Sequence, residues 1–196
     1  MMLFAPIEWL SRIILIILVA LSVWSVAIIL ERRKFYQELK KRGDSQKIKE
    51  AIRLKNKTAI LDLCRTERSF FSELVEEIII LDSSAKIENA FLFYINEKKA
   101  PFEKGLAVLG TLGSTTPFIG LLGTILGIIV SFGKLSQGDG GTNEVMFSLA
   151  EALILTAVGL LVAIPAVIAF NYFSRRMKVV LSEASALKDL FIAFKD

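Results

Sequence analysis

The single carboxylate in the long apolar stretches of this sequence, residues 13–30, 105–133 and 145–173, is Glu151. An ionised group in hydrocarbon costs at least a few kcal/mol on insertion scales, so acids kept there usually serve a pathway or a partner. A carboxyl group in such a place can take up and release a proton. We therefore expect Glu151 to have a functional role, in a pathway or toward a partner; the alternative is an acid near the outer interface that simply reaches water.

Small and hydroxyl side chains recur at helical spacing in the second and third stretches. Each stretch presents one narrow face of this kind: Gly113, Thr116, Gly120, Thr124, Gly127 and Ser131 on one, and Ser148, Ala152, Thr156, Gly159, Ala163 and Ala166 on the other. Lipid gives no hydrophobic drive for association, so membrane helices use small faces to pack closely. The hydroxyls on both faces also suit a pore wall, although a hydroxyl can equally bond to its own helix. Both interpretations stay open.

Two residues modify this picture. On an ideal helical wheel Glu151 lies about 60° from Ser148, so it borders the small face rather than centring it. Pro117 removes one backbone hydrogen bond and frees a carbonyl near Gly113, which predicts a kink.

These residues need three membrane helices to position them. The chain is 54% hydrophobic, and its mean hydropathy is +0.56. A helix of roughly 20 apolar residues spans the hydrocarbon core, about 30 Å thick. The sequence therefore predicts an all-α polytopic membrane protein with spans at residues 1–31, 105–133 and 145–174. A soluble bundle with buried helices is the weaker alternative.

Lys and Arg near the helix ends predict the orientation. Residues 31–57 hold eleven Lys and Arg against four Asp and Glu, and Arg175 and Arg176 follow the third span. Because basic residues stay on the cytoplasmic side, we expect the N-terminus and a short loop at 134–144 to lie on the outer side of the membrane. The first span ends in "ERRK" rather than a cleavage site, so we expect it to be retained as an anchor.

The parts outside the membrane read as amphipathic helices. Residues 32–104 show no strand-like alternation, and apolar residues recur at helical spacing from Phe71 to Ile79 and from Ile87 to Ile95. The tail at 175–196 repeats this pattern. We expect these segments to be cytoplasmic extensions of the membrane helices, packed on each other, because too few apolar residues remain for an enzyme-sized domain.

Most other chemistry is excluded by composition. The chain has no His and one cysteine, Cys64, so we expect no catalytic site, no metal site and no cofactor. The net charge of +4 is a topology signal, because no folded basic face with base-stacking aromatics is evident. We therefore expect no nucleic-acid partner.

The second and third apolar stretches resemble those of a known family. "GSTTPFIGLLGTILGIIVSF" followed by "LAEALILTAVGLLVAIPAVIAFNYF" is similar to the ExbB/TolQ/MotA proton-channel subunits over about residues 102–175. Three membrane helices and a short chain fit ExbB or TolQ rather than the four-helix flagellar stator subunit. The stretch "LAVLGTLGSTTPFIG" looks most like ExbB.

The resemblance implies a role. Such subunits form a ring, typically a pentamer, in the bacterial inner membrane around an ExbD- or TolR-like single helix with an intramembrane Asp. They use the proton motive force to drive a TonB- or TolA-like protein, and TonB-dependent transport is the expected process. A TolQ-type role in the Tol-Pal system, or a non-conducting scaffold, is the alternative.

The family's functional positions correspond to Thr124, Thr156 and Glu151. Leu126 and Leu155 depart from the pattern, which commonly has Trp and Ala there. Neither change removes a polar group.

Overall fold

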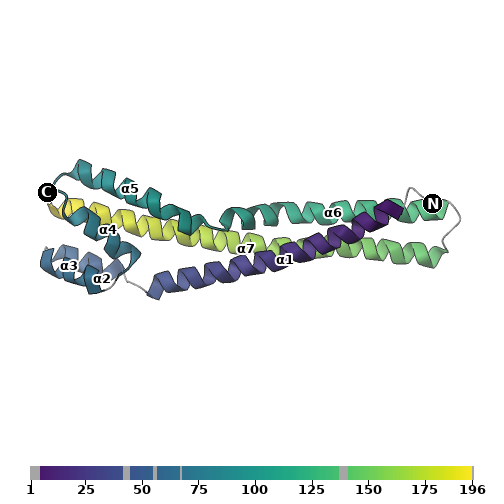
Figure 1. The fold of residues 1–196 in the computed structure, drawn as a ribbon, viewed down its shortest axis with the longest axis horizontal. Helices are drawn as coiled ribbons and strands as arrows, with labels where there is room; N and C mark the ends of the chain where they lie inside the picture. The colour runs from purple at the N-terminus through teal and green to yellow at the C-terminus, as the bar shows by residue number, and fades with distance from the viewer. Residues whose placement is uncertain (1–4, 42–44, 55–56, 67, 137–140, 196) are drawn as a thin grey trace. The chain divides into compact units, whose positions relative to one another are not determined.

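The computed structural model describes residues 5–41, 45–54, 57–66, 68–136 and 141–195. Every regular element in these ranges is a helix (Figure 1). The helices are α1 (Ala5–Lys41), α2 (Ser45–Arg53), α3 (Lys57–Thr66), α4 (Phe70–Ile79), α5 (Ser84–Glu103), α6 (Leu106–Ser136) and α7 (Thr142–Lys195). The predicted all-α class is confirmed.

The chain divides into two compact units. The first, the membrane unit, holds residues 1–30 and 105–172; the second, the compact helical unit, holds residues 31–104 and 173–196. Helices α1 and α7 supply residues to both units, and the units are described separately below.

In the membrane unit, α1, α6 and α7 contain the spans. Stretches at Trp9–Leu39, Leu106–Ser136 and Thr142–Ala193 are long and apolar enough to cross a membrane, which confirms the three predicted spanning helices. Only 22–33% of their most apolar windows is buried. Ile16 and Phe118 expose 68% and 69% of their surface. A water-soluble unit would cover side chains of this kind, whereas lipid accommodates them.

The helix ends differ slightly from the predicted boundaries. Helix α6 continues to Ser136 and α7 begins at Thr142, so both helices include residues of the predicted loop at 134–144. Residues 137–140 of that loop lie outside the described ranges. Helix α7 also runs without a break from the predicted third span into the predicted tail helix. Residues 173–195 contain neither Gly nor Pro, so no residue there ends the helix.

One glycine fixes the start of α6. Gly105 has a φ of +75°, in the left-handed region that favours glycine. A Cβ at this position would lie 2.7 Å from Cγ2 of Ile28 on α1, so a side chain would meet both backbone strain and a neighbour. Both factors require glycine here.

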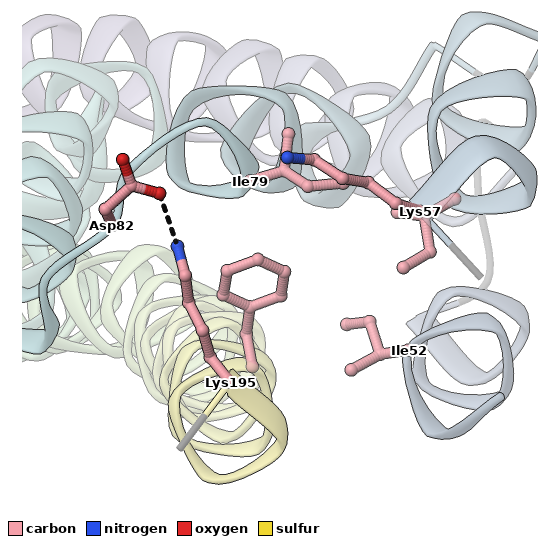
Figure 2. A pocket seen from close by; sticks show the side chains of 7 residues that line it. Ile52, Lys57, Ile79, Asp82 and Lys195 are labelled. Atoms are coloured by element: carbon pink, nitrogen blue, oxygen red, sulfur yellow. Dashed lines mark ion pairs between the residues drawn. The ribbon is translucent and has the colours of Figure 1, made fainter. Parts of the chain in front are cut away.

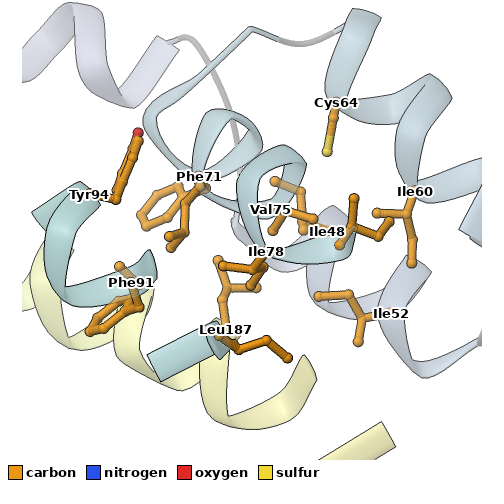
Figure 3. Close-up of a cluster of buried hydrophobic side chains, with 14 residues drawn as sticks. Ile48, Ile52, Ile60, Cys64, Phe71, Val75, Ile78, Phe91, Tyr94 and Leu187 are labelled. Atoms are coloured by element: carbon orange, nitrogen blue, oxygen red, sulfur yellow. The ribbon is translucent and has the colours of Figure 1, made fainter. Parts of the chain in front are cut away.

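The compact helical unit is built around large aliphatic side chains (Figure 3). Leu74, Val75 and Ile78 on α4 are fully buried, and Leu187 on α7 and Ile87 on α5 join them. These are the residues whose helical spacing the sequence displays. Helix α4 begins at a capping box, in which the Ser69 and Ser72 side chains each bond to the other residue's backbone N–H.

A pocket of about 320 Å³ lies at the edge of this core (Figure 2). Its apolar lining includes Ile52, Ile79 and Phe191. At its rim, Nζ of Lys195 lies 3.6 Å from a carboxylate oxygen of Asp82, an exposed ion pair that contributes little to stability.

Candidate functional site

The two small-residue faces meet each other inside the membrane unit. At their centre, a Cβ added to Gly120 would lie 2.7 Å from the carbonyl oxygen of Leu155. A Cβ added to Gly159 would lie 2.7 Å from the carbonyl oxygen of Thr116. The backbones of α6 and α7 are therefore in direct contact, and only glycine fits on either side. We call this contact the seam.

The seam extends in both directions from this point. A Cβ on Gly113 would collide with the side chain of Val167, and one on Gly127 would lie 2.5 Å from the Cβ of Ala152. Ala163 is also buried. The predicted small residues thus pack α6 against α7 within a single chain, which is the helix-packing interpretation. A direct exposure of these residues to a pore stays a prediction.

Two of the predicted pathway hydroxyls are enclosed by the seam. Thr116 and Ser131 have no exposed surface. The Thr116 hydroxyl donates to the carbonyl of Leu112 at 2.7 Å, and the Ser131 hydroxyl to that of Gly127 at 2.8 Å. These bonds satisfy both donors within their own helix. In this single chain neither hydroxyl faces open space.

The hydroxyls of Thr124 and Thr156 connect the two helices. Oγ1 of Thr156 donates to Oγ1 of Thr124 at 3.3 Å, and Oγ1 of Thr124 donates in turn to the carbonyl of Leu121 at 2.7 Å. Thr124 is buried and Thr156 is half-buried. The two predicted motif hydroxyls therefore form a short hydrogen-bond chain that crosses from α7 to α6 and ends at a backbone carbonyl of α6.

Glu151 lies outside the seam, beside it. Its side chain is exposed and lines a groove of about 490 Å³, to which α1 contributes Ser11, Arg12 and Leu15. Ser148, the half-buried hydroxyl one turn earlier, lines the same groove. This agrees with the wheel position of Glu151 at the border of the small face. The structure brings Glu151 and Ser148 to one groove, and neither Thr116 nor Ser131 is among the residues that line it.

Helix α6 passes through Pro117 without interruption. The proline lies one residue after Thr116, whose carbonyl contacts Gly159 across the seam. A kink at this residue stays a prediction.

The two residues that depart from the family pattern pack together. Leu155 is buried in a cluster with Ile14 and Leu18 of α1, and Leu126 packs against the same cluster. Leu155 on α7 and Leu126 on α6 thus fill one space beneath α1.

Comparisons with known proteins identify the family. A profile of the MotA/TolQ/ExbB proton channel family matches residues 62–186, well over half of the chain. The chain belongs to the MotA/TolQ/ExbB family. This confirms the resemblance carried by the second and third apolar stretches, and a channel family agrees with the prediction that the protein is not an enzyme.

The chain is similar to members of both branches. It is 41% identical to the biopolymer transport protein ExbB of Xanthomonas campestris over 96 residues, 48% of this chain and 38% of that protein. It is 41% identical to the Tol-Pal system protein TolQ of Pseudomonas aeruginosa over 108 residues, 55% of this chain and 47% of that protein.

A third relative is the ExbB of Aquifex aeolicus, with 38% identity over 109 residues, 53% of this chain and 70% of that protein. The chain spans less than half of the first two relatives. Identity of this level does not separate an ExbB from a TolQ.

Sequence reasoning missed the charged residues around Glu151. Arg12, Lys134 and Glu144 line the same groove. Arg12 stands just before the first uncharged stretch, a costly place for a cation, and this was the available signal. Nothing in the sequence indicates which helix Arg12 faces. Among the described residues, no group of three or more Asp, Glu, Cys or His side chains is placed to hold a metal ion.

Proposed function

We propose that this chain is an ExbB-type proton-channel subunit of the bacterial inner membrane. Several copies, typically five in the family, form a ring around the single helix of an ExbD-like partner that carries an intramembrane Asp. The complex uses the proton motive force to energise a TonB-like protein, and through it transport across the outer membrane. The N-terminus is periplasmic and the C-terminus cytoplasmic, as the basic residues in the last part of α1, beyond it and within α7 favour.

The observation that carries this proposal is the hydrogen-bonded pair of Thr124 and Thr156. Both stand at positions where the resemblance in sequence places hydroxyls of the family's motif. A direct hydrogen bond between helices in apolar surroundings adds little stability, about 0.6 kcal/mol on average. Packing alone therefore gives weak grounds for two hydroxyls at this point, whereas a proton relay needs groups that both donate and accept.

The closed seam changes which surfaces line the conduit. Because the two small faces cover each other, the proposed shared cavity is bounded by the neighbouring faces of α6 and α7. Leu121 and Ile128 lie about one turn on either side of Thr124, and both are exposed. Leu153 and Leu160 flank Thr156 in the same way. These apolar side chains around one pair of hydroxyls would suit a partner helix that is apolar except for a single acidic residue.

The mechanism then follows from charge and position. The partner's Asp is the main proton carrier, the threonine pair and nearby waters relay protons, and Glu151 exchanges protons or tunes the site. One charge that crosses 100 mV supplies about 2.3 kcal/mol. This energy biases rotation or rocking of the partner helix within the ring.

The test uses the full complex with its single-helix partner in proteoliposomes. We expect Glu151→Gln and Thr156→Val to reduce proton influx at least tenfold while leaving assembly intact by native mass spectrometry. Thr111→Val is the matched control, because its exposed hydroxyl donates to the carbonyl of Ala107 on its own helix. Wild-type influx in both test variants would overturn the proposal and favour a non-conducting scaffold.

A Tol-Pal role is the second candidate, because the TolQ match is as strong in identity as the ExbB match. Expression in cells that lack ExbB, and separately in cells that lack TolQ, decides between them. We expect restored uptake of iron chelates in the first and no restored detergent resistance in the second. The reverse pattern would assign the chain to the Tol-Pal system.

A further inference from the structure

The groove beside Glu151 contains an unusual set of charges for a membrane-facing site. Arg12 comes from α1, Lys134 from α6, and Glu144 and Glu151 from α7. These are two cations and two anions around a volume of about 490 Å³. Ser11 and Ser148 add hydroxyls to the same lining. All three helices of the membrane unit thus direct polar groups into one space.

Such a set favours water in the groove. A charged side chain that faces hydrocarbon is costly, and the cost falls when it reaches water or an opposite charge. A volume of this size admits on the order of ten waters, and its polar lining gives them hydrogen-bond partners. Val130, Ile154 and Leu155 add apolar side chains to the same lining.

The groove is also the open approach to Glu151. The seam next to it is closed, because Ala152 is 3% exposed and lies against Gly127. Further along the seam, Thr116 and Ser131 are sealed and bonded to their own helix. Water that reaches Glu151 within one chain therefore comes along the groove under α1 and not between the small faces.

We propose that this groove is a hydrated outer vestibule that supplies protons to Glu151, with Arg12 as a positioning residue that keeps water and the carboxylate at its mouth. The inference rests on the proposed function, because it names the access route to that acid. It differs from a central pore in that α1 forms one wall. The vestibule opens near the start of α7, the end that the proposed orientation places at the periplasm.

The experiment labels single thiols in the assembled complex. The only native thiol, Cys64, is buried in the compact helical unit and is replaced by Ser in the background. Ser148→Cys then reports on the groove, and Thr116→Cys, at a position with 0% exposure, is the matched control in the seam. Membrane-impermeant methanethiosulfonate reagents, one anionic and one cationic, are added from the periplasmic side.

We expect both reagents to label Ser148→Cys at least tenfold faster than Thr116→Cys, and labelling to block proton influx. Adding Arg12→Gln removes one positive charge close to the thiol. The anionic reagent should then react roughly threefold more slowly and the cationic one roughly threefold faster. A purely structural role of Arg12 would change both rates in the same direction.

Three results would overturn the vestibule. The first is no labelling of Ser148→Cys in the complex. The second is parallel rate changes in Arg12→Gln. The third is complete labelling with unchanged influx while Glu151→Gln abolishes it, which would leave the acid functional and place its water supply elsewhere. Wild-type influx in Glu151→Gln would instead overturn the proposed function itself, whatever the labelling pattern.

Discussion

The two units of this protein achieve close packing by opposite means. In the membrane unit, α6 and α7 meet at glycines, backbone against backbone, and their large side chains such as Phe118 and Leu161 are exposed. In the compact helical unit, Leu74, Ile78 and Leu187 are fully buried. The membrane unit exposes its large apolar side chains, and the compact helical unit buries them.

The difference follows from the surroundings that each unit suits. In water, burial of a Leu or Ile side chain gains about 1.5–3 kcal/mol, so large apolar residues collect in a core. In lipid that gain vanishes, and close contact between backbones, with van der Waals attraction, holds helices together. The comparison predicts that the compact helical unit loses stability when a large buried side chain is shortened. It also predicts that the seam loses stability when a glycine is replaced by a larger residue.

The largest effect is expected from emptying the core. Leu74→Ala removes a fully buried side chain from α4 and should lower the free energy of unfolding by about 3–4 kcal/mol, within the range for core truncations. Leu54→Ala, at a position that is 73% exposed, should change it by less than about 0.5 kcal/mol. Chemical denaturation of the full chain in detergent measures both. Equal losses would contradict the comparison.

Filling the seam should come next. Gly120→Val places two methyl groups where a Cβ alone already lies 2.7 Å from a carbonyl of α7. We expect a loss of about 1–3 kcal/mol, measured by unfolding in mixed micelles. Gly141→Val is the control, because a Cβ there meets nothing within 4 Å. A stable Gly120→Val protein with unchanged unfolding would show that the seam is not tight.

A polar contact in the core should have a smaller effect. The Tyr94 hydroxyl donates to the carbonyl of Phe70 at 2.8 Å, so Tyr94→Phe should cost about 1 kcal/mol of unfolding free energy. Tyr36→Phe should cost less, because its hydroxyl reaches the carbonyl of Phe173 only at 3.4 Å. A larger loss in Tyr36→Phe would reverse the expected order.

Removal of the hydroxyl bridge in the seam should affect stability less still. Thr124→Val keeps the shape of the side chain and removes its bond with Thr156, for an expected loss of about 0.6 kcal/mol. Proton influx should fall far more than stability does. A loss above about 2 kcal/mol in mixed micelles, with influx unchanged, would make this pair structural rather than functional.

The smallest effect concerns pH. Burial, and then the neighbouring carboxylate of Glu97, raises the pKa of Glu77 above 4.5. The folded state then binds the proton more tightly than the unfolded state, so stability should fall as pH rises from about 4.5 through the raised pKa. Glu77→Gln should flatten this slope in denaturation curves between pH 4 and 7. A slope that stays unchanged would exclude Glu77 as its source.

The spacing of residues predicted the helices well and their partners poorly. Steps of three and four identified both small faces and the amphipathic face of α4, because helical periodicity is local. The sequence left open whether the small faces meet each other or a pore, since packing and conduction favour the same small residues. Thr116 and Ser131 show the limit: their types suit a pathway, yet the structure encloses both within the seam.

The sequence did not predict the charged groove for a different reason. Arg12 and Glu151 are far apart in the sequence, and contacts such as the packing of Ile14 and Leu18 against Leu155 set which side of α1 faces α7. Leu126 illustrates the same point, because it packs against the cluster that contains Leu155, and the sequence does not show this contact.

The glycine contact in the seam also constrains how lineages of this protein can change. Gly120 and Gly159 each face a carbonyl of the opposite helix at a distance that excludes even a methyl group. A second substitution to a smaller neighbouring side chain cannot make room for a larger residue at either position, because the contacting atoms belong to the main chain. Related sequences should therefore retain glycine at both positions, whereas the residue at Gly141 should vary. An alignment of natural variants would then show the seam as two positions that are always glycine.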